Sequence, residues 1–445
     1  MQNYMIENKD KNSTTVFLML LSLIMVITVC VFNRVGYNAS RFAVLLLIAI
    51  SMFINIDKSL CLLVFCLPFV SILKWSAVSV TILPFLCMII VAKIIFSNQR
   101  ISMNRIMCVM LLLIIQLFVS FAYDSSLLSL ISFFVSALFV VTSTEHFNSN
   151  RCKNKNLVFD LSVFLSFAMI LSILLCDLFP DILYVINLKE QIELDSSGRF
   201  AAMLGDPNEY SQLVLISIAL LLFIISRCKT KTCKMACILG MVYLCISGYR
   251  SYSKSYALSL MVLWGISIFI YLYGTYKQKG SRKVLFVVIP AFLFFVVGAV
   301  IIYNNVIVPV FEARSQESTD ILTGRGAIWG NYIEGLFSHF EYLLFGVGYG
   351  NVTYVVSDNV VTNVVPHNLY LEYVAQFGII GVLLLLGCWK KSVSMLREKK
   401  SVFLWLAMLM FLVTSFGISA NSNDCIFVIM VILAAPGINV TNDIC

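Results

Sequence analysis

The sequence predicts an all-α integral membrane protein with about 12–14 transmembrane helices and two longer extracytoplasmic loops. Hydrophobic residues make up 60% of the 445 residues, charged residues only 12%, and the mean hydropathy is +0.94. A water-soluble domain of this size does not have such a composition. Lysines and arginines recur in alternate connecting loops, which is typical of the cytoplasmic side of a polytopic membrane protein.

Residues 1–178 are predicted to form an amino-terminal transmembrane scaffold with little polar chemistry. Each apolar run is long enough, or nearly so, for the roughly 20 residues of a spanning helix. The runs are 16–32, 41–56, 59–73, 77–96, 104–122, 126–143 and 157–178. The first run has no small-residue cleavage site, so we expect it to be retained.

The second half alternates membrane segments with the two long loops. Residues 179–208 form the first outer loop, 209–303 further transmembrane helices, 304–366 the large outer loop with an amphipathic helix, and 367–445 the C-terminal transmembrane helices. The runs here are 209–226, 235–248, 253–274, 284–303, 368–388, 402–419 and 424–436. Four of the runs are short, so some are expected to be re-entrant or tilted.

Basic residues cluster in five loops that a 14-span count puts on one side, which we expect to be cytoplasmic together with both termini. The clusters are Lys93, Arg100 and Arg105; Arg151, Lys153 and Lys155; Arg227, Lys229, Lys231 and Lys234; Lys277, Lys279, Arg282 and Lys283; Lys390, Lys391, Arg397, Lys399 and Lys400. The net charge of +8 is therefore a topology signal and not a nucleic-acid footprint.

None of the 14 cysteines lies in the two long outer loops. This distribution suits packing and a reducing inner face. No CxxC pair or His/Cys cluster with metal spacing is present, so we expect no metal and no cofactor.

Cationic residues stand at the mouths of two spans. Arg199 lies in the segment SSGRFAAMLGDPNEYSQ, and Arg250 and Lys254 lie in the short outer loop SGYRSYSKS. An arginine fork can hold two phosphate oxygens, so an anionic ligand is one interpretation. Contact with lipid headgroups is the other.

The large outer loop contains a short helix after Thr323. Trp329, Ile333, Leu336, Phe340 and Leu344 recur at steps of three and four, so this helix should lie on the membrane surface. Arg325 is at its beginning, where Thr323 could cap and free backbone N–H groups favour an anion. The glycines at positions 346, 348 and 350 indicate a flexible turn and not a dinucleotide fingerprint.

His367 follows Pro366 and precedes Asn368 at the edge of the next span. A neutral imidazole there can take a proton from an attacking hydroxyl near neutral pH. Capping of a helix or contact with a headgroup is the alternative. His339 is expected to be merely solvated, and His146 belongs to an inner loop.

Four stretches in this order resemble the superfamily of O-antigen polymerases (Wzy-type) and O-antigen ligases, bacterial integral membrane glycosyltransferases. They are GRFAAMLGDPNEYSQ with Arg199, SYSKSYALSL, TGRGAIWGNYIEGL with Arg325 and Trp329, and HNLYLEYVAQFGIIG with His367 and Asn368. Where the family usually has arginine after serine, this chain has Lys254, so Lys254 and the nearby Arg250 are both candidates for that role.

The resemblance implies a GT-C-like polytopic enzyme of the bacterial inner membrane, with its active site facing the periplasm. Its donor would be an undecaprenyl-diphosphate-linked oligosaccharide. Arg199, Arg325, and Lys254 or Arg250 would then hold the diphosphate, Asn368 and Trp329 would touch substrate, and His367 would be the base of a metal-independent, inverting transfer. A chain-length regulator protein is a further partner that the resemblance suggests.

Within the superfamily a polymerase adds the glycan to the non-reducing end of another lipid-linked repeat unit of O-antigen or capsule, whereas a ligase transfers it to lipid A core. The number of spans and the modest outer loop favour the polymerase. A polysaccharide transporter or flippase is the alternative of another class. It is disfavoured because the predicted mid-span positions are nearly free of ionisable side chains.

Overall fold

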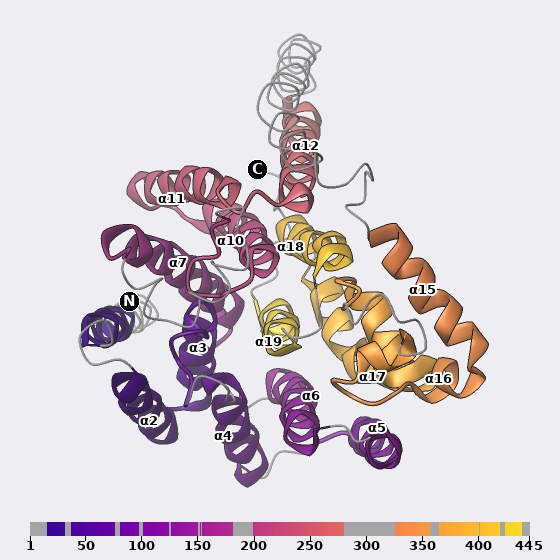
Figure 1. Cartoon of the computed structure of the whole chain (residues 1–445). Helices are drawn as coiled ribbons and strands as arrows, with labels where there is room; N and C mark the ends of the chain where they lie inside the picture. Colours follow the sequence, from indigo (N-terminus) through magenta and orange to yellow (C-terminus); the bar gives the residue numbers. More distant parts are fainter. Residues whose placement is uncertain are drawn as a thin grey trace.

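The computed structural model forms an all-helical bundle, as the sequence predicted (Figure 1). It describes residues 16–31, 37–75, 81–97, 101–123, 126–149, 152, 154–180, 199–279, 325–356, 365–399, 401–418 and 423–437. Within these ranges every regular element is a helix, and the only β pairing is an isolated bridge between Lys74 and Thr81.

Six helices are long and apolar enough to cross a membrane. They are α5 (Met103–Ala122), α6 (Leu127–Asn148), α7 (Leu157–Leu178), α10 (Pro207–Arg227), α11 (Lys231–Tyr249) and α17 (Leu369–Glu398). The others in the bundle are the helix Val16–Val31, α2 (Tyr37–Phe53), α3 (Ile56–Cys66), α4 (Ile82–Phe96), α12 (Lys254–Lys279), α18 (Val402–Thr414) and α19 (Asn423–Ala434). Every predicted apolar run coincides with one of these helices except 284–303, which lies outside the described residues.

The helix α10 is the most enclosed of the six, since most of its side chains are buried. Pro207 occupies its first turn, and the Asp206 side chain caps it by accepting from the backbone N–H groups of Asn208 and Glu209. It packs against α7, α11 and α18. Large apolar side chains are instead exposed on peripheral helices, for example Phe121 at 84%, as expected for a surface that faces lipid.

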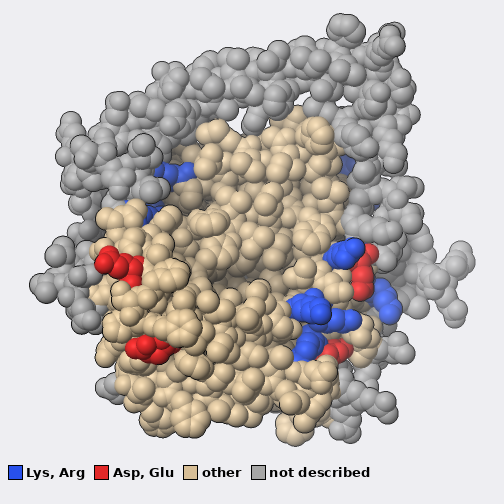
Figure 2. All heavy atoms as spheres, turned by 90° about the vertical axis from the view of Figure 1, so that its right-hand side faces the viewer, with Lys and Arg blue, Asp and Glu red and all other residues tan. Residues whose placement is uncertain are grey.

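One end of the bundle, here called the basic face, carries the basic loop clusters as far as they are described. Contacts between helix ends hold it together: Arg105 with Glu145, Lys399 Nζ with the Leu433 carbonyl, and Val158 N with the Pro436 carbonyl at 3.0 Å. In Figure 2 a cluster of basic side chains, with acidic ones beside it, lies at the lower right. Acidic side chains and some basic ones lie at the left, and a broad uncharged surface separates the two groups.

The other end, here called the His367 face, carries the loops that contain the predicted site. Contacts between loops and helix ends join it: Ser71 N to the Met203 carbonyl at 3.2 Å, Phe200 N to the Arg250 carbonyl at 3.0 Å, and Gln212 Nε2 to Thr414 Oγ1 at 2.9 Å. The helices α15 (Arg325–Ser338) and α16 (Phe340–Phe345) belong to this end and lie beside α17 in Figure 1.

One expectation about the cysteines was wrong. Cys228 and Cys233 form a disulfide across the turn between α10 and α11, where the Cα atoms are 6.3 Å apart. The turn brings the two residues within bridging distance, which the assumption of a uniformly reduced inner face overlooked. Several free cysteines of the described region, such as Cys66 and Cys176, are buried and serve packing as predicted.

Candidate active site

Three loop segments meet on the His367 face. Residues 199–206 precede α10, residues 250–253 connect α11 to α12, and residues 365–368 precede α17. The first two are joined directly, because Arg199 Nε donates to the Ser251 carbonyl at 2.9 Å. The carboxylate of Asp206 and the guanidinium groups of Arg199 and Arg325 all shift the pKa of His367, so the third segment lies within electrostatic range of them.

Arg199 is held by a network of buried polar side chains. Its terminal nitrogen donates to Asn208 Oδ1 at 3.0 Å, and the hydroxyl of Ser253 donates to the same oxygen at 3.1 Å. Ser253 Oγ in turn lies 2.8 Å from Ser255 Oγ in the first turn of α12. The network fixes the direction of the guanidinium across two loops, as an anion site requires.

Arg325 is the first described residue of α15, and its side chain lies near Ser255 of the same network. A Cβ built on Gly417, which follows α18, would lie 3.4 Å from Ser255 Oγ and 3.5 Å from a terminal nitrogen of Arg325. These two distances place the Arg325 guanidinium and the Ser255 hydroxyl next to the same glycine. The predicted cap, Thr323, lies outside the described residues.

His367 combines burial with an unused nitrogen. Its Nδ1 is buried and has no hydrogen-bond partner within the described residues. Burial lowers the pKa of His367, the Arg325 charge lowers it further, and Asp206 opposes the shift. The imidazole is therefore neutral at neutral pH and can accept a proton.

Backbone strain concentrates in these three segments. Among the described residues other than glycine, only Ala202, Tyr252 and His367 have positive φ, at 48°, 46° and 48°, and each segment contains one of them. Such conformations cost on the order of 1–3 kcal/mol each and tend to occur at functional sites. This coincidence supports the same site independently of the charges.

Trp329 and Asn368, predicted to contact substrate, make structural contacts. Trp329 Nε1 donates to the Pro366 carbonyl at 2.8 Å and so fixes the residue before His367. The Asn368 side chain caps α17 by accepting from the N–H groups of Tyr370 at 3.1 Å and Leu371 at 3.2 Å. Both side chains position the histidine segment, and contact with substrate remains a prediction for them.

The two candidate cations next to α12 differ in their surroundings. Arg250 forms an ion pair with Asp177 at 2.7 Å and stacks over the Phe200 ring at 3.9 Å from its centroid. Lys254 begins α12, directly between Ser253 and Ser255 of the Arg199 network. Their predicted roles remain predictions, and these positions favour Lys254 for the diphosphate and Arg250 for anchoring the loop.

The glycine run of the large loop forms a turn, as predicted, and backbone hydrogen bonds join it to α17. Val347 N donates to the Ala375 carbonyl at 2.8 Å and Gly348 N to the Gln376 carbonyl at 3.1 Å, both on α17. At Gly378 the backbone of α17 has φ 63° and ψ 177°, which breaks the helix and frees those carbonyls. A Cβ on Gly346 would lie only 2.2 Å from the Gln376 oxygen, so the turn requires glycine there.

The predicted single apolar stripe is also divided. The helix α15 ends at Ser338, and α16 starts afresh at Phe340. Leu336 is buried, whereas Ile333 and Phe340 are 48% and 65% exposed, and their contact with the membrane surface stays a prediction. His339 is exposed and pairs with Glu341 at 3.3 Å, so it stays outside the site as expected.

Sequence reasoning missed three polar residues of the site: Asn208, Ser253 and Ser255. All three stand in motifs whose cations drew attention first. A sequence pattern that could have indicated these residues was present, because both motifs contain a short polar side chain within one turn of the start of a helix.

Comparison with known proteins agrees with the motifs. Residues 239–386 match the model of the O-antigen ligase family, and the match contains Arg250, Lys254, Arg325, Trp329 and His367. No curated protein matches the chain. This match and the four motifs in their order lead to one conclusion: residues 239–386 of the chain are similar to the O-antigen ligase family.

Proposed function

We propose that the protein is a polysaccharide polymerase of the bacterial inner membrane. It transfers a glycan from polyprenyl diphosphate to the non-reducing end of another lipid-linked repeat unit. The observation that carries the proposal is the buried Nδ1 of His367, which has no hydrogen-bond partner in the described part of the chain and lies within electrostatic reach of the Arg199 and Arg325 guanidinium groups. A general base next to clustered cations suits the expulsion of a diphosphate by a sugar hydroxyl.

The proposed reaction is a single displacement. A hydroxyl of the acceptor sugar gives its proton to the neutral His367 imidazole while its oxygen attacks the anomeric carbon of the donor. The bond from that carbon to the diphosphate oxygen breaks, with inversion, and the diphosphate leaves with both electrons. Arg199, Arg325 and Lys254 offset its developing negative charge, so the chemistry at this site proceeds without a metal.

Orientation follows from charge. The basic face carries the described parts of the lysine- and arginine-rich loops, so we assign it to the cytoplasm and the His367 face to the outside. Lipid-linked oligosaccharides would then reach the His367 face from the outer leaflet. Reporter fusions after α7 and α11 test this assignment, because both helices end on the His367 face.

Transfer to lipid A core, the ligase reaction, is the second candidate, and the description of the matched family favours it. A deletion strain separates the two. Core bearing a single repeat unit indicates a polymerase, whereas long lipid-linked polymer beside bare core indicates a ligase. A flippase is distinguished in vitro, because a carrier leaves the length of purified lipid-linked repeat units unchanged.

Point variants test the site. We expect His367→Ala and Arg325→Ala each to abolish polymer formation while the protein still accumulates in the membrane. A suitable control is Lys229→Ala, an inner-loop lysine on the basic face, which should leave polymer length unchanged. Full-length polymer from His367→Ala would refute the assignment of the base.

A further inference from the structure

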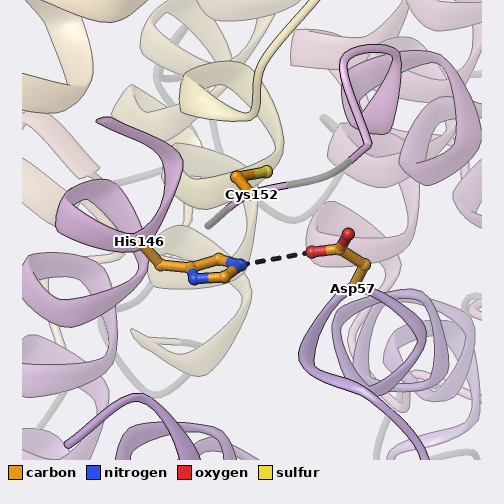
Figure 3. Close-up of side chains that lie close together, drawn as sticks. All are labelled: Asp57, His146 and Cys152. Atoms are coloured by element: carbon orange, nitrogen blue, oxygen red, sulfur yellow. Dashed lines mark hydrogen bonds and ion pairs between the residues drawn. The ribbon is translucent and has the colours of Figure 1, made fainter. Parts of the chain in front are cut away.

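A second cluster of reactive side chains lies on the basic face, away from the His367 site. Asp57 is in the first turn of α3, His146 in the last turn of α6, and Cys152 in the connection between α6 and α7. One ligand atom of each residue lies within 4.8 Å of those of the other two. Figure 3 shows the ring of His146 directed at the Asp57 carboxylate, with Cys152 next to the pair.

Local structure brings Cys152 to His146. Ser149 ends α6, and both its N–H, at 3.1 Å, and its hydroxyl, at 2.7 Å, bond to the His146 carbonyl. Cys152 N then donates to the Ser149 carbonyl at 3.4 Å, which turns the chain back over the end of the helix. On the other side of the cysteine, Asn154 Nδ2 donates to Asp160 of α7 at 2.8 Å.

Asp57 is held equally well. Asn55 caps α3 by accepting from the N–H of Lys58, so the first turn of α3, with Asp57, has a defined position. The neighbouring Lys58 has its ammonium over the ring of Phe17, 5.7 Å from the centroid. The carboxylate meets His146 Nε2 at 3.2 Å.

The donor set matches a borderline divalent cation. Thiolate sulfur, imidazole nitrogen and carboxylate oxygen bind Zn²⁺ at about 2.3, 2.0–2.1 and 2.0–2.2 Å in tetrahedral geometry. Two such ligands are then roughly 3.3–3.7 Å apart. The imidazole and carboxylate already stand at nearly this separation. The sulfur lies within 4.8 Å of both ligand atoms, so it has to move by at most about 1.5 Å, within the range of a side-chain adjustment.

Burial favours a bound ion over a solvated ion pair. His146 and Cys152 are 3% and 2% exposed, and the Asp57 side chain is 20% exposed, so a water molecule can still reach the carboxylate side. Three protein ligands with water in the fourth position are an ordinary zinc arrangement. Such a site would connect α3 to the junction of α6 and α7. Its ligands Asp57 and His146 are 89 residues apart in the sequence.

We propose that Asp57, His146 and Cys152 bind one Zn²⁺ ion with water as the fourth ligand. Binding displaces the thiol proton of Cys152, which passes to solvent. His146 binds as a neutral imidazole through Nε2 and keeps its proton on Nδ1. The ion stabilises the basic face and takes no part in glycosyl transfer on the opposite face.

Cobalt is the probe that tests this site, because a thiolate bound to tetrahedral Co²⁺ gives ligand-field and charge-transfer absorption. The full chain is purified in detergent with a reductant, stripped with chelator and titrated with Co²⁺. Cys228→Ser/Cys233→Ser is the parent, since that reduced pair would offer a competing thiol site. We expect one equivalent of Co²⁺, displaced by one equivalent of Zn²⁺.

Variants identify the ligands. Cys152→Ser should abolish the charge-transfer band, and His146→Gln and Asp57→Asn should each weaken binding by about tenfold or more. Cys61→Ser is the matched control, because Cys61 is a buried thiol on α3 one turn after Asp57, and it should leave the spectrum unchanged.

Two outcomes would overturn the proposal: a parent without the charge-transfer band, or a band that survives Cys152→Ser. Size-exclusion chromatography shows whether each variant is folded. Should Asp57→Asn or His146→Gln aggregate, the Cys152→Ser spectrum decides alone, since that substitution changes a single atom. Polymerisation is not the readout, so failure of the metal site and failure of the proposed function remain distinct.

Discussion

The hydrogen bond from Trp329 to Pro366 holds His367 in a strained conformation. Trp329 Nε1 meets the Pro366 carbonyl at 2.8 Å, and the next residue, His367, has φ 48°. A histidine in this region costs on the order of 1–3 kcal/mol, and one hydrogen bond contributes about 0.5–1.5 kcal/mol net. The free energy of this hydrogen bond is thus similar to that of the backbone strain, which it helps to offset.

Trp329→Phe removes the donor and keeps an aromatic ring on α15. Loss of about 0.5–1.5 kcal/mol lowers the population of the strained conformer by up to about tenfold. We expect kcat to fall by up to the same factor, because fewer molecules present the imidazole correctly. The KM for the lipid-linked donor should change little, since Arg199 and Arg325 are retained.

The assay is the initial rate of polymer formation from purified lipid-linked repeat units at varied donor concentration. Trp389→Phe is the matched control, because Trp389 Nε1 is buried on α17 and has no hydrogen-bond partner within the described residues. Removing that N–H forfeits no bond. Unchanged kcat for Trp329→Phe, or an equal fall for Trp389→Phe, would refute the positioning role.

Three further predictions concern charge and backbone. Asp206→Asn keeps a cap on α10 but removes the charge that raises the pKa of His367. Only neutral His367 accepts a proton, so the acid limb of the pH profile of kcat/KM should move to lower pH. A move to higher pH would contradict this prediction. Gly378→Ala should lower the thermal unfolding midpoint in detergent by several degrees, because φ is 63° there and a Cβ would lie 2.2 Å from a carbonyl oxygen of α16. Gly330→Ala is the control and should leave the midpoint unchanged, because the space around its Cβ is open. Arg250→Ala should reduce the free energy of unfolding by about 1 kcal/mol or less and leave the affinity for the lipid-linked donor unchanged, because its side chain is 43% exposed and engaged in an ion pair. A loss of donor affinity at an unchanged free energy of unfolding would assign Arg250 to the diphosphate.

The sequence by itself determined the fold class. A backbone in lipid must satisfy its hydrogen bonds internally, so long apolar runs can only become helices. The helices of the described region lie where the runs predicted them. The grouping of the described basic loops at one end followed in the same way from counting spans. Motif order singled out Arg199, Arg325 and His367, which adjoin one another.

Only the tertiary structure decided which distant residues meet. The periodicity of apolar residues in a sequence identifies side chains three or four positions apart that share one face of a helix. It does not show which of several similar apolar helices pack against each other. The pairing of Arg250 with Asp177 and the meeting of Asp57, His146 and Cys152 therefore had no sequence signal. Nor could the sequence reveal that the Nδ1 of His367 is buried without a hydrogen-bond partner among the described residues, because burial is a property of the assembled bundle.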